Sequence, residues 1–170
     1  MLAPALADPN PVLIFEHVML YNVEAELDER IDAVDITHAS IRRAGTDVTV
    51  VTCGGSLPRA LAAADTLAAE GIAAEVIDLR VLRPLDMTTV AASVARTHRC
   101  VIVDEGWKSG SLAAEVCARL VEMVFYELDA PIARVCSAEV PMPYAAHLEQ
   151  AALPNAGRIV AAVRQVVRPA

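Results

Sequence analysis

Two kinds of hydrophobic pattern alternate along the chain after residue 38. Short runs of β-branched and aliphatic residues are typical of buried strands in parallel sheets. Between these runs, apolar residues recur at intervals of three and four, which is the spacing of one helix face. The runs predict an edge strand at Ala39–Arg43 and inner strands at Val48–Thr52, Ala74–Leu79, Cys100–Val103 and Ile132–Cys136.

The predicted helices each carry an apolar face and a residue that favours a helix end. Ser56, Asp86 and Asn155 are good N-cap residues, because their side chains can accept a hydrogen bond from a free backbone N–H. A further helix is predicted from about Ser111 to Tyr126. The residues expected to face the core are Leu57, Leu61, Ala64, Leu67, Ala68, Met87, Val90, Ala91, Val94, Leu112, Val116, Leu120, Met123, Ile159, Val160, Val163 and Val167.

This alternation of strands and helices predicts an α/β fold. Aliphatic strands need helices on both faces, and a helix that joins two parallel strands gives a right-handed crossover. We therefore expect a three-layer α/β/α sandwich with a mostly parallel sheet in residues 37–170.

The residues before this domain follow a different pattern. Val12–Phe15 is a short apolar run and predicts a buried strand within residues 1–21. Asn22–Asp35 is rich in acidic residues and has no sustained period. Residues 22–36 are therefore predicted to form a linker or a long surface loop.

Composition narrows the possible functions. The 170 residues are 55% hydrophobic but only 4% aromatic, so the core must be aliphatic. The net charge of −8 opposes a phosphate backbone, and we expect no nucleic-acid partner. No apolar stretch is long enough to span a membrane, and the first residues lack a signal-peptide pattern. We expect a cytoplasmic protein with reduced, buried cysteines and no membrane contact.

The turn Cys53-Gly54-Gly55-Ser56 is the first candidate for chemistry. It links a predicted strand to a predicted helix, so its backbone N–H groups could bind an anion. The turn lacks the further glycines or the Lys-Ser/Thr pair of a phosphate-binding loop, which favours a purely structural turn. The histidines and cysteines show no metal-site spacing, and structural or solvated roles are expected for His17, His38, His98 and His147.

The segment Asp104-Glu105-Gly106-Trp107 is the best local candidate for a functional surface. It follows a predicted parallel strand, so its side chains should lie at the carboxyl edge of the sheet, where open α/β folds place ligands. The alternative is a turn with solvated acids and a packed tryptophan. Ser109 and Ser111 lie near the start of a predicted helix, and N-capping explains both.

Several segments together carry a family resemblance. They are Phe15–Tyr21, Arg80–Asp86, Val103–Trp107, Leu128–Pro131 and Val140–Tyr144, which contains Pro141-Met142-Pro143-Tyr144. In order and spacing they resemble the β subunits of thiamine-diphosphate-dependent 2-oxo acid dehydrogenases, most closely those of the pyruvate dehydrogenase type. The resemblance covers only the C-terminal half or so of such a subunit, from about Asn10 to about Val167.

The resemblance implies a function for a parent enzyme rather than for these residues alone. Such enzymes decarboxylate pyruvate oxidatively and transfer the acetyl group to lipoamide, with two α and two β subunits. Residues 1–21 resemble the last strand of the pyrimidine-binding domain, and residues 37–170 resemble a transketolase C-terminal domain. Thiamine diphosphate and magnesium are implied for the parent enzyme and not for this chain. We expect a non-catalytic assembly module that is a fragment of a longer subunit or a truncated gene product.

The resemblance also implies interface residues. It favours contacts with other subunits for Asp104, Glu105 and Trp107, and docking of the basic peripheral subunit-binding domain of the acyltransferase for Asp129, Glu127 and the chain terminus. Two alternatives stay open. The parent enzyme could use branched-chain 2-oxo acids or acetoin, or the chain could be an independent α/β domain that binds a nucleotide-like ligand.

Overall fold

A computed structural model describes residues 1–24 and 34–167 of the chain. Helices and strands alternate from residue 40 onward, as the hydrophobic pattern predicts. The elements are α1 (Leu2–Ala7), η1 (Val18–Leu20), β1 (Ser40–Arg43), β2 (Val48–Thr52), α2 (Ser56–Ala69), β3 (Ala74–Asp78), α3 (Met87–Thr97), β4 (Cys100–Trp107), α4 (Leu112–Val124), η2 (Phe125–Glu127), β5 (Ala133–Ser137), α5 (Ala146–Ala152) and α6 (Ala156–Val167).

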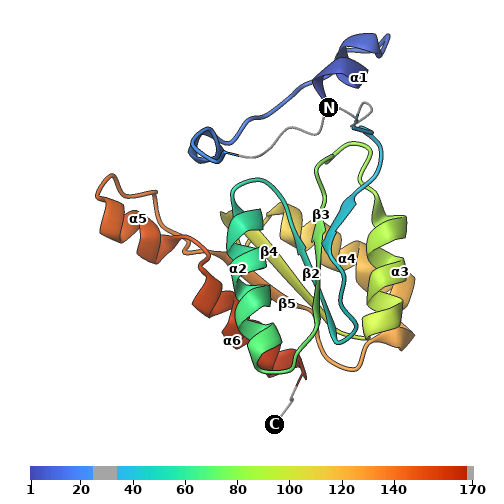
Figure 1. Ribbon diagram of the computed structural model, residues 1–170, viewed down its shortest axis with the longest axis vertical. Coiled ribbons are helices and arrows are strands. Elements are labelled where there is room, and N and C mark those ends of the chain that lie inside the picture. Colours follow the sequence, from blue (N-terminus) through green and yellow to red (C-terminus); the bar gives the residue numbers. More distant parts are fainter. Residues whose placement is uncertain (25–33, 168–170) are drawn as a thin grey trace.

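The strands form one mostly parallel sheet in the order β1-β3-β2-β4-β5. β1 pairs with β3 in the antiparallel direction, whereas the other neighbours are parallel. Helices α2 and α6 cover one face of the sheet, and α3 and α4 cover the other (Figure 1). The expected three-layer α/β/α sandwich is therefore confirmed.

Each inner strand contributes side chains to both faces, because successive residues of a strand point in opposite directions. In β2, Val48 and Val50 pack with α2 and α6, whereas Val51 packs with α3 and α4. In β4, Val101 likewise packs with α2 and α6, and Ile102 packs with α3 and α4. The continuous aliphatic runs thus fill two separate cores.

Most of the predicted helix ends and core positions are confirmed. Asp86 caps α3 by accepting a hydrogen bond from the Thr89 backbone N–H, with an N–O distance of 3.1 Å. Asn155 caps α6 through the Arg158 N–H at 2.9 Å. At α2 the prediction was wrong: the helix begins at Ser56 itself, and the buried hydroxyl of Ser56 has no partner among the described residues.

Three other predictions about side chains and strands were also wrong. Ala68 is exposed, because the buried face of α2 runs through Ala60, Ala64 and Leu67. Met123 is exposed rather than inward, because the buried face of α4 runs through Val116, Leu120 and Val124. Val12–Phe15 is not a strand: its residues have no regular secondary structure, and Leu13 and Phe15 are more than 80% exposed. A strand needs a partner for its backbone groups, and none of the described strands pairs with this run.

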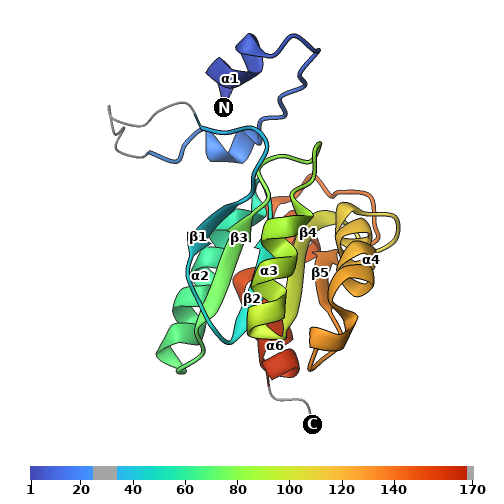
Figure 2. The same cartoon turned by 90° about the vertical axis from the view of Figure 1, so that its right-hand side faces the viewer.

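Residues 1–24 lie beyond one edge of the sheet, and α5 projects sideways from the body (Figures 1 and 2). The first segment reaches the edge at which the parallel strands end. Much of the predicted linker, residues 25–33, and the chain terminus, residues 168–170, lie outside the described residues.

Candidate functional site

The carboxyl edge of the sheet contains a topological switch point. The chain passes from β2 to its neighbour β3 on one side, and then to β4 on the other side of β2. The loops that follow β2 and β4 therefore leave in opposite directions and open a crevice, which is where open α/β sheets bind ligands. The Cys53–Gly55 turn and the Asp104–Trp107 segment, both singled out from the sequence, meet at this edge.

His17 contacts both of these loops, at Gly55 and at Glu105. Its Nε2 lies 2.9 Å from Oε2 of Glu105, and Arg59 of α2 donates to Oε1 of the same carboxylate at 2.6 Å. The three side chains are between a quarter and a third exposed. Each oxygen of Glu105 thus has its own nitrogen partner in a partly dehydrated setting, where such contacts are stronger than on an open surface.

The His17 ring rests directly on the backbone of Gly55. A Cβ at position 55 would lie 2.5 Å from Nε2 and 2.6 Å from Cε1 of the ring. Gly54, by contrast, has open space at its Cβ position but a φ of +56°. The two glycines thus serve different needs: Gly54 allows the turn, and Gly55 leaves room for the imidazole.

Asp104 organises the loop after β4 and does not reach into the crevice as a free acid. Its Oδ2 accepts from the Ala113 N–H at 2.9 Å, at the start of α4, and its Oδ1 accepts from the Gly106 N–H at 2.8 Å. The Ser137 hydroxyl donates to the Glu105 carbonyl at 2.7 Å. Ser111 occupies the N-cap position of α4 without a side-chain capping bond, so Asp104 supplies the cap that was predicted for the serine.

The carboxyl edge offers no activated nucleophile among the described residues. Burial raises the pKa of the Cys53 thiol to about 11, with further contributions from the Asp104, Asp78 and Glu105 carboxylates. The thiol is therefore protonated and unreactive at neutral pH. The same three acids give the turn a negative surrounding, which disfavours the anion-binding alternative for Cys53–Ser56.

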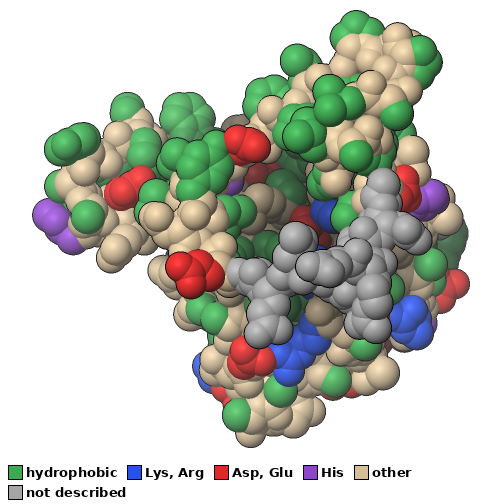
Figure 3. Space-filling view, turned by 45° about the horizontal axis from the view of Figure 1, so that its top comes forward, with side chains coloured by type: hydrophobic (Ala, Val, Ile, Leu, Met, Phe, Trp, Pro, Cys, Tyr) green, Lys and Arg blue, Asp and Glu red, His purple; other side chains and the backbone are tan. Residues whose placement is uncertain are grey.

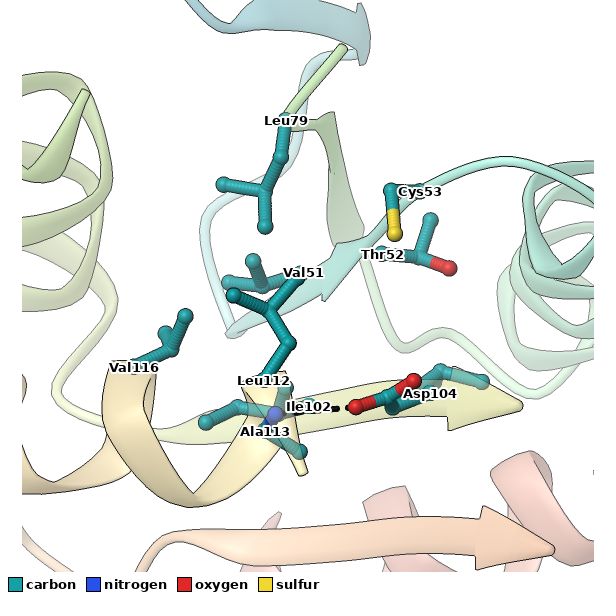
Figure 4. Close-up of a pocket in the computed structure, with 10 residues that line it drawn as sticks. Val51, Thr52, Cys53, Leu79, Ile102, Asp104, Leu112, Ala113 and Val116 are labelled. Carbon is teal, nitrogen blue, oxygen red and sulfur yellow. Dashed lines mark hydrogen bonds between the residues drawn. The ribbon is translucent and has the colours of Figure 1, made fainter. Parts of the chain in front are cut away.

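The cavity beneath this turn is small. Its volume is about 10 Å³, and it lies between β2, β4 and the start of α4, with Asp104 turned toward Ala113 (Figure 4). A cavity of that size holds one water molecule at most. Its lining is mainly apolar: Val51, Thr52, Cys53, Leu79, Ile102, Val103, Asp104, Leu112, Ala113 and Val116.

A second cluster lies at the opposite, amino-terminal edge of the sheet. Asp129 Oδ2 pairs with Arg99 at 3.0 Å, and the Asp129 N–H donates to the carbonyl of His98. His98 Nδ1 lies 2.8 Å from the carbonyl oxygen of Glu127. Next to this cluster is an apolar groove of about 710 Å³ lined by Cys117, Val121, Phe125, Tyr126, Leu128, Asp129, Ala130, Pro131 and Ile132.

The five residues expected at interfaces thus fall into two groups at opposite edges. Asp104, Glu105 and Trp107 are at the carboxyl edge, and Glu127 and Asp129 are at the amino edge. Sequence reasoning did not connect His17 or Arg59 with Glu105. The only signal was the meeting of two loops at one edge, and it could not indicate that a third segment would enter between them.

Comparisons with known proteins agree with this architecture. The profile of the family described as "Transketolase, C-terminal domain" matches residues 37–159.

The chain belongs to the transketolase C-terminal domain family. It is 46% identical over 171 aligned residues to the pyruvate dehydrogenase E1 component subunit beta-1 of Arabidopsis thaliana, covering 97% of this chain and 47% of the relative. It is 42% identical over 168 residues to the beta subunit of an acetoin:2,6-dichlorophenolindophenol oxidoreductase from Cupriavidus necator, covering 99% of this chain and 50% of the relative. The resemblance inferred from the motifs is confirmed, and the chain spans about half the length of these relatives.

A solved structure shares the fold. A chain described as a split gene transketolase in an inactive β4 tetramer aligns with a TM-score of 0.67 and 27% identity, covering 84% of this chain and 45% of that chain. Within the described residues, no helix is long and apolar enough to cross a membrane, and His, Cys, Asp and Glu form no cluster suited to a metal ion.

Neither of the two cavities matches a site for thiamine diphosphate. The cavity at the carboxyl edge is tens of times smaller than a cofactor site, which typically measures about 300–1,000 Å³. The larger groove is lined by one acid, Asp129, and by no basic residue that could bind a diphosphate.

Proposed function

We propose that this chain is the C-terminal assembly part of a pyruvate dehydrogenase β subunit. Its parent enzyme decarboxylates pyruvate oxidatively with thiamine diphosphate and magnesium and transfers the acetyl group to lipoamide. The observation that carries this proposal is the 41–46% identity to pyruvate dehydrogenase β subunits of plants, a slime mould, an insect and a bacterium, which extends along nearly the whole chain.

The geometry supports an assembly role rather than a catalytic one. At the switch point, His17 lies against Gly55 and Glu105, and the nearby Cys53 thiol is protonated. Two aromatic side chains lie on the outside: Tyr126 and Tyr144 are fully or almost fully exposed. Exposed aromatic residues of this kind are enriched at protein interfaces.

In this proposal the partners are an α subunit, a second β subunit and the acyltransferase core. The amino-edge cluster suits a basic peripheral subunit-binding domain, because the side chains of Glu127 and Asp129 are more than half exposed. We place the parent enzyme in the cytoplasm, although several of the eukaryotic relatives are described as mitochondrial.

An acetoin-cleaving enzyme is the second candidate. It is favoured by the similarity to the Cupriavidus necator subunit, whose 42% identity lies within the range of the pyruvate dehydrogenase relatives. The described part of the chain has no substrate pocket that could separate the two activities.

Two chimeras test the proposal and separate the candidates. In the first chimera, this chain replaces the matching C-terminal part of the pyruvate dehydrogenase β subunit of Rhizobium meliloti. In the second chimera, it replaces the matching part of the β subunit of the acetoin enzyme of Cupriavidus necator. Each is produced with its own α subunit, with the natural pair as the control. We expect the first chimera to co-purify as a complex of two α and two β subunits and to decarboxylate pyruvate in the presence of an artificial electron acceptor.

The outcomes are distinct. Assembly and activity of the second chimera alone would favour the acetoin enzyme. If neither chimera binds its α subunit while both natural pairs do, the assembly role is wrong. Calorimetry of the isolated chain with thiamine diphosphate and magnesium should show no saturable binding, because the described residues provide no matching site.

A further inference from the structure

The contact between His17 and the carboxyl edge has an unusual geometry for a surface ion pair. The imidazole donates to Glu105 from Nε2, and it lies so close to Gly55 that a methyl group there would come within 2.9 Å of three ring atoms. Arg59 binds the second oxygen of Glu105 and fixes the direction of the carboxylate. The imidazole of His17 is therefore held both by its close fit to Gly55 and by the hydrogen bond from its Nε2 to Glu105.

We propose that Gly55, Glu105 and Arg59 form a binding seat for an imidazole ring, which His17 fills from within the same chain. When the seat is filled, residues 11–21 are strapped across the carboxyl edge of the domain. This inference concerns the chain itself and does not rest on the function proposed above.

The chemistry of the seat favours imidazole over other ligands. A carboxylate oxygen needs a donor, and the bare Cα of Gly55 allows a planar ring to approach where any other residue would block it. Asp104 and Asp78 add negative charge near the turn, as their effect on the pKa of Cys53 shows, after that of burial. An anionic ligand would be repelled there, whereas a neutral or protonated imidazole would not.

The strap depends on this one side chain. Among residues 1–24, only His17 forms a hydrogen bond with residues 34–167. Most neighbouring side chains of the strap are exposed, with Leu13, Phe15 and Met19 each at least 68% exposed, although Leu20 is half-buried. Figure 3 shows hydrophobic side chains on the surface of the part of the chain that extends beyond the body of the domain. Release of one ring should therefore free the whole strap while the sheet stays folded.

Backbone NMR relaxation of the full chain tests the strap. In the wild-type protein, order parameters of residues 11–21 should be about 0.8, close to the rigid limit, whereas a freed strap should fall below about 0.6. We expect this fall in His17→Ala and also in Gly55→Ala, where the new methyl group takes the place of the ring. Gly55 has an ordinary negative φ, so alanine fits its backbone conformation.

Two controls isolate the effect. His147→Ala removes an exposed histidine from α5, and Gly157→Ala adds a methyl group in α6 without a clash. Both should leave the strap rigid. An unchanged strap in His17→Ala, or equal loosening in the controls, would overturn the proposal.

Free imidazole then probes the seat directly. In His17→Ala, it should shift the amide signals of Gly54, Gly55 and Glu105 with saturation in the millimolar range. Wild-type protein, whose seat is filled, and Gly55→Ala, whose seat is blocked, should not respond. The same shifts in all three proteins would show that no imidazole seat exists. If imidazole causes no such shifts in a folded His17→Ala protein, the imidazole seat likewise does not exist.

Discussion

Nε2 of His17 lies 2.9 Å from Oε2 of Glu105, although the two residues are 88 positions apart in the chain. The contact joins the first segment to the edge of the sheet at which β2 and β4 diverge. It also gives Glu105 two nitrogen partners, because Arg59 reaches the other oxygen. Stability and position of the first segment are thus linked through a single carboxylate.

Replacement of Glu105 should measure that link. In Glu105→Ala, the partly buried groups of Arg59 and His17 lose their shared acceptor, and we expect the free energy of unfolding to fall by about 1–3 kcal/mol. Urea denaturation followed by circular dichroism measures the change. Glu122→Ala, an exposed acid of α4, is the matched control and should stay within about 0.5 kcal/mol of the wild type. If the two substitutions change the free energy of unfolding equally, the contacts of Glu105 with His17 and Arg59 do not stabilise the fold.

The α3 cap makes stability depend on pH. Burial opposes ionisation of Asp86, but hydrogen bonds from the Thr89 hydroxyl and from the backbone N–H groups of Thr89 and Ala39 outweigh it and hold the pKa of Asp86 below its ordinary value. A lowered folded-state pKa stabilises the fold above the unfolded-state pKa, and this contribution is lost as the pH falls through the folded value.

Asp86→Ala should therefore lose about 1–2 kcal/mol of stability at pH 7. The difference from the wild type should begin to shrink below about pH 4, where Asp86 becomes protonated in the unfolded chain, and should disappear as the pH falls through the lower folded-state pKa. Denaturation curves at several pH values test this, with Thr88→Ala of the same helix turn as the control. A difference that stays constant with pH would mean that the charge of Asp86 contributes nothing to the cap.

Two glycines should respond in opposite directions to a methyl group. At Gly157 in α6, a Cβ would meet only Asn155 Oδ1, at 3.4 Å, and alanine should stabilise the helix by about 0.5 kcal/mol. At Gly45, a Cβ would overlap the backbone of Ala74 and Glu75 in β3. Gly45→Ala should therefore destabilise the protein by at least about 1–3 kcal/mol. Thermal unfolding of the two variants gives the signs directly.

The strands and helices of the main domain could be predicted from the sequence because their patterns are local. Val48–Thr52 consists of valine and threonine and is buried at every position, as a central strand requires, and Asp86 caps α3, which follows β3. Val12–Phe15 is equally apolar, but whether such a run becomes a strand depends on a partner strand, which the run itself does not specify. The local pattern could not distinguish these two cases.

The candidate site could be predicted only in part, for a related reason. Glu105 was found because a residue after a parallel strand must lie at the carboxyl edge. Its partners come from other elements: Arg59 from α2, and His17 from a segment before the domain. Their approach depends on tertiary packing, and no spacing along the chain indicates it. Tertiary packing also places Asp129 and Glu105 at opposite edges of the sheet. The hydrogen bond from the Asp129 N–H to the His98 carbonyl fixes Asp129 at the amino edge.

The ion pair of Asp129 with Arg99 sharpens the prediction for the amino edge. If a basic peripheral subunit-binding domain docks there, Asp129→Ala removes an attractive charge and also leaves Arg99 unpaired next to the partner. We expect the affinity of the assembled enzyme for the isolated binding domain to fall by roughly fivefold, with a weaker dependence on salt. Arg99→Ala should have the opposite effect, because it leaves Asp129 free to attract the partner. Titration calorimetry at two salt concentrations measures both, and pyruvate decarboxylation by the free enzyme should stay unchanged. If both substitutions weaken binding equally, the pair acts through local structure and the docking surface lies elsewhere.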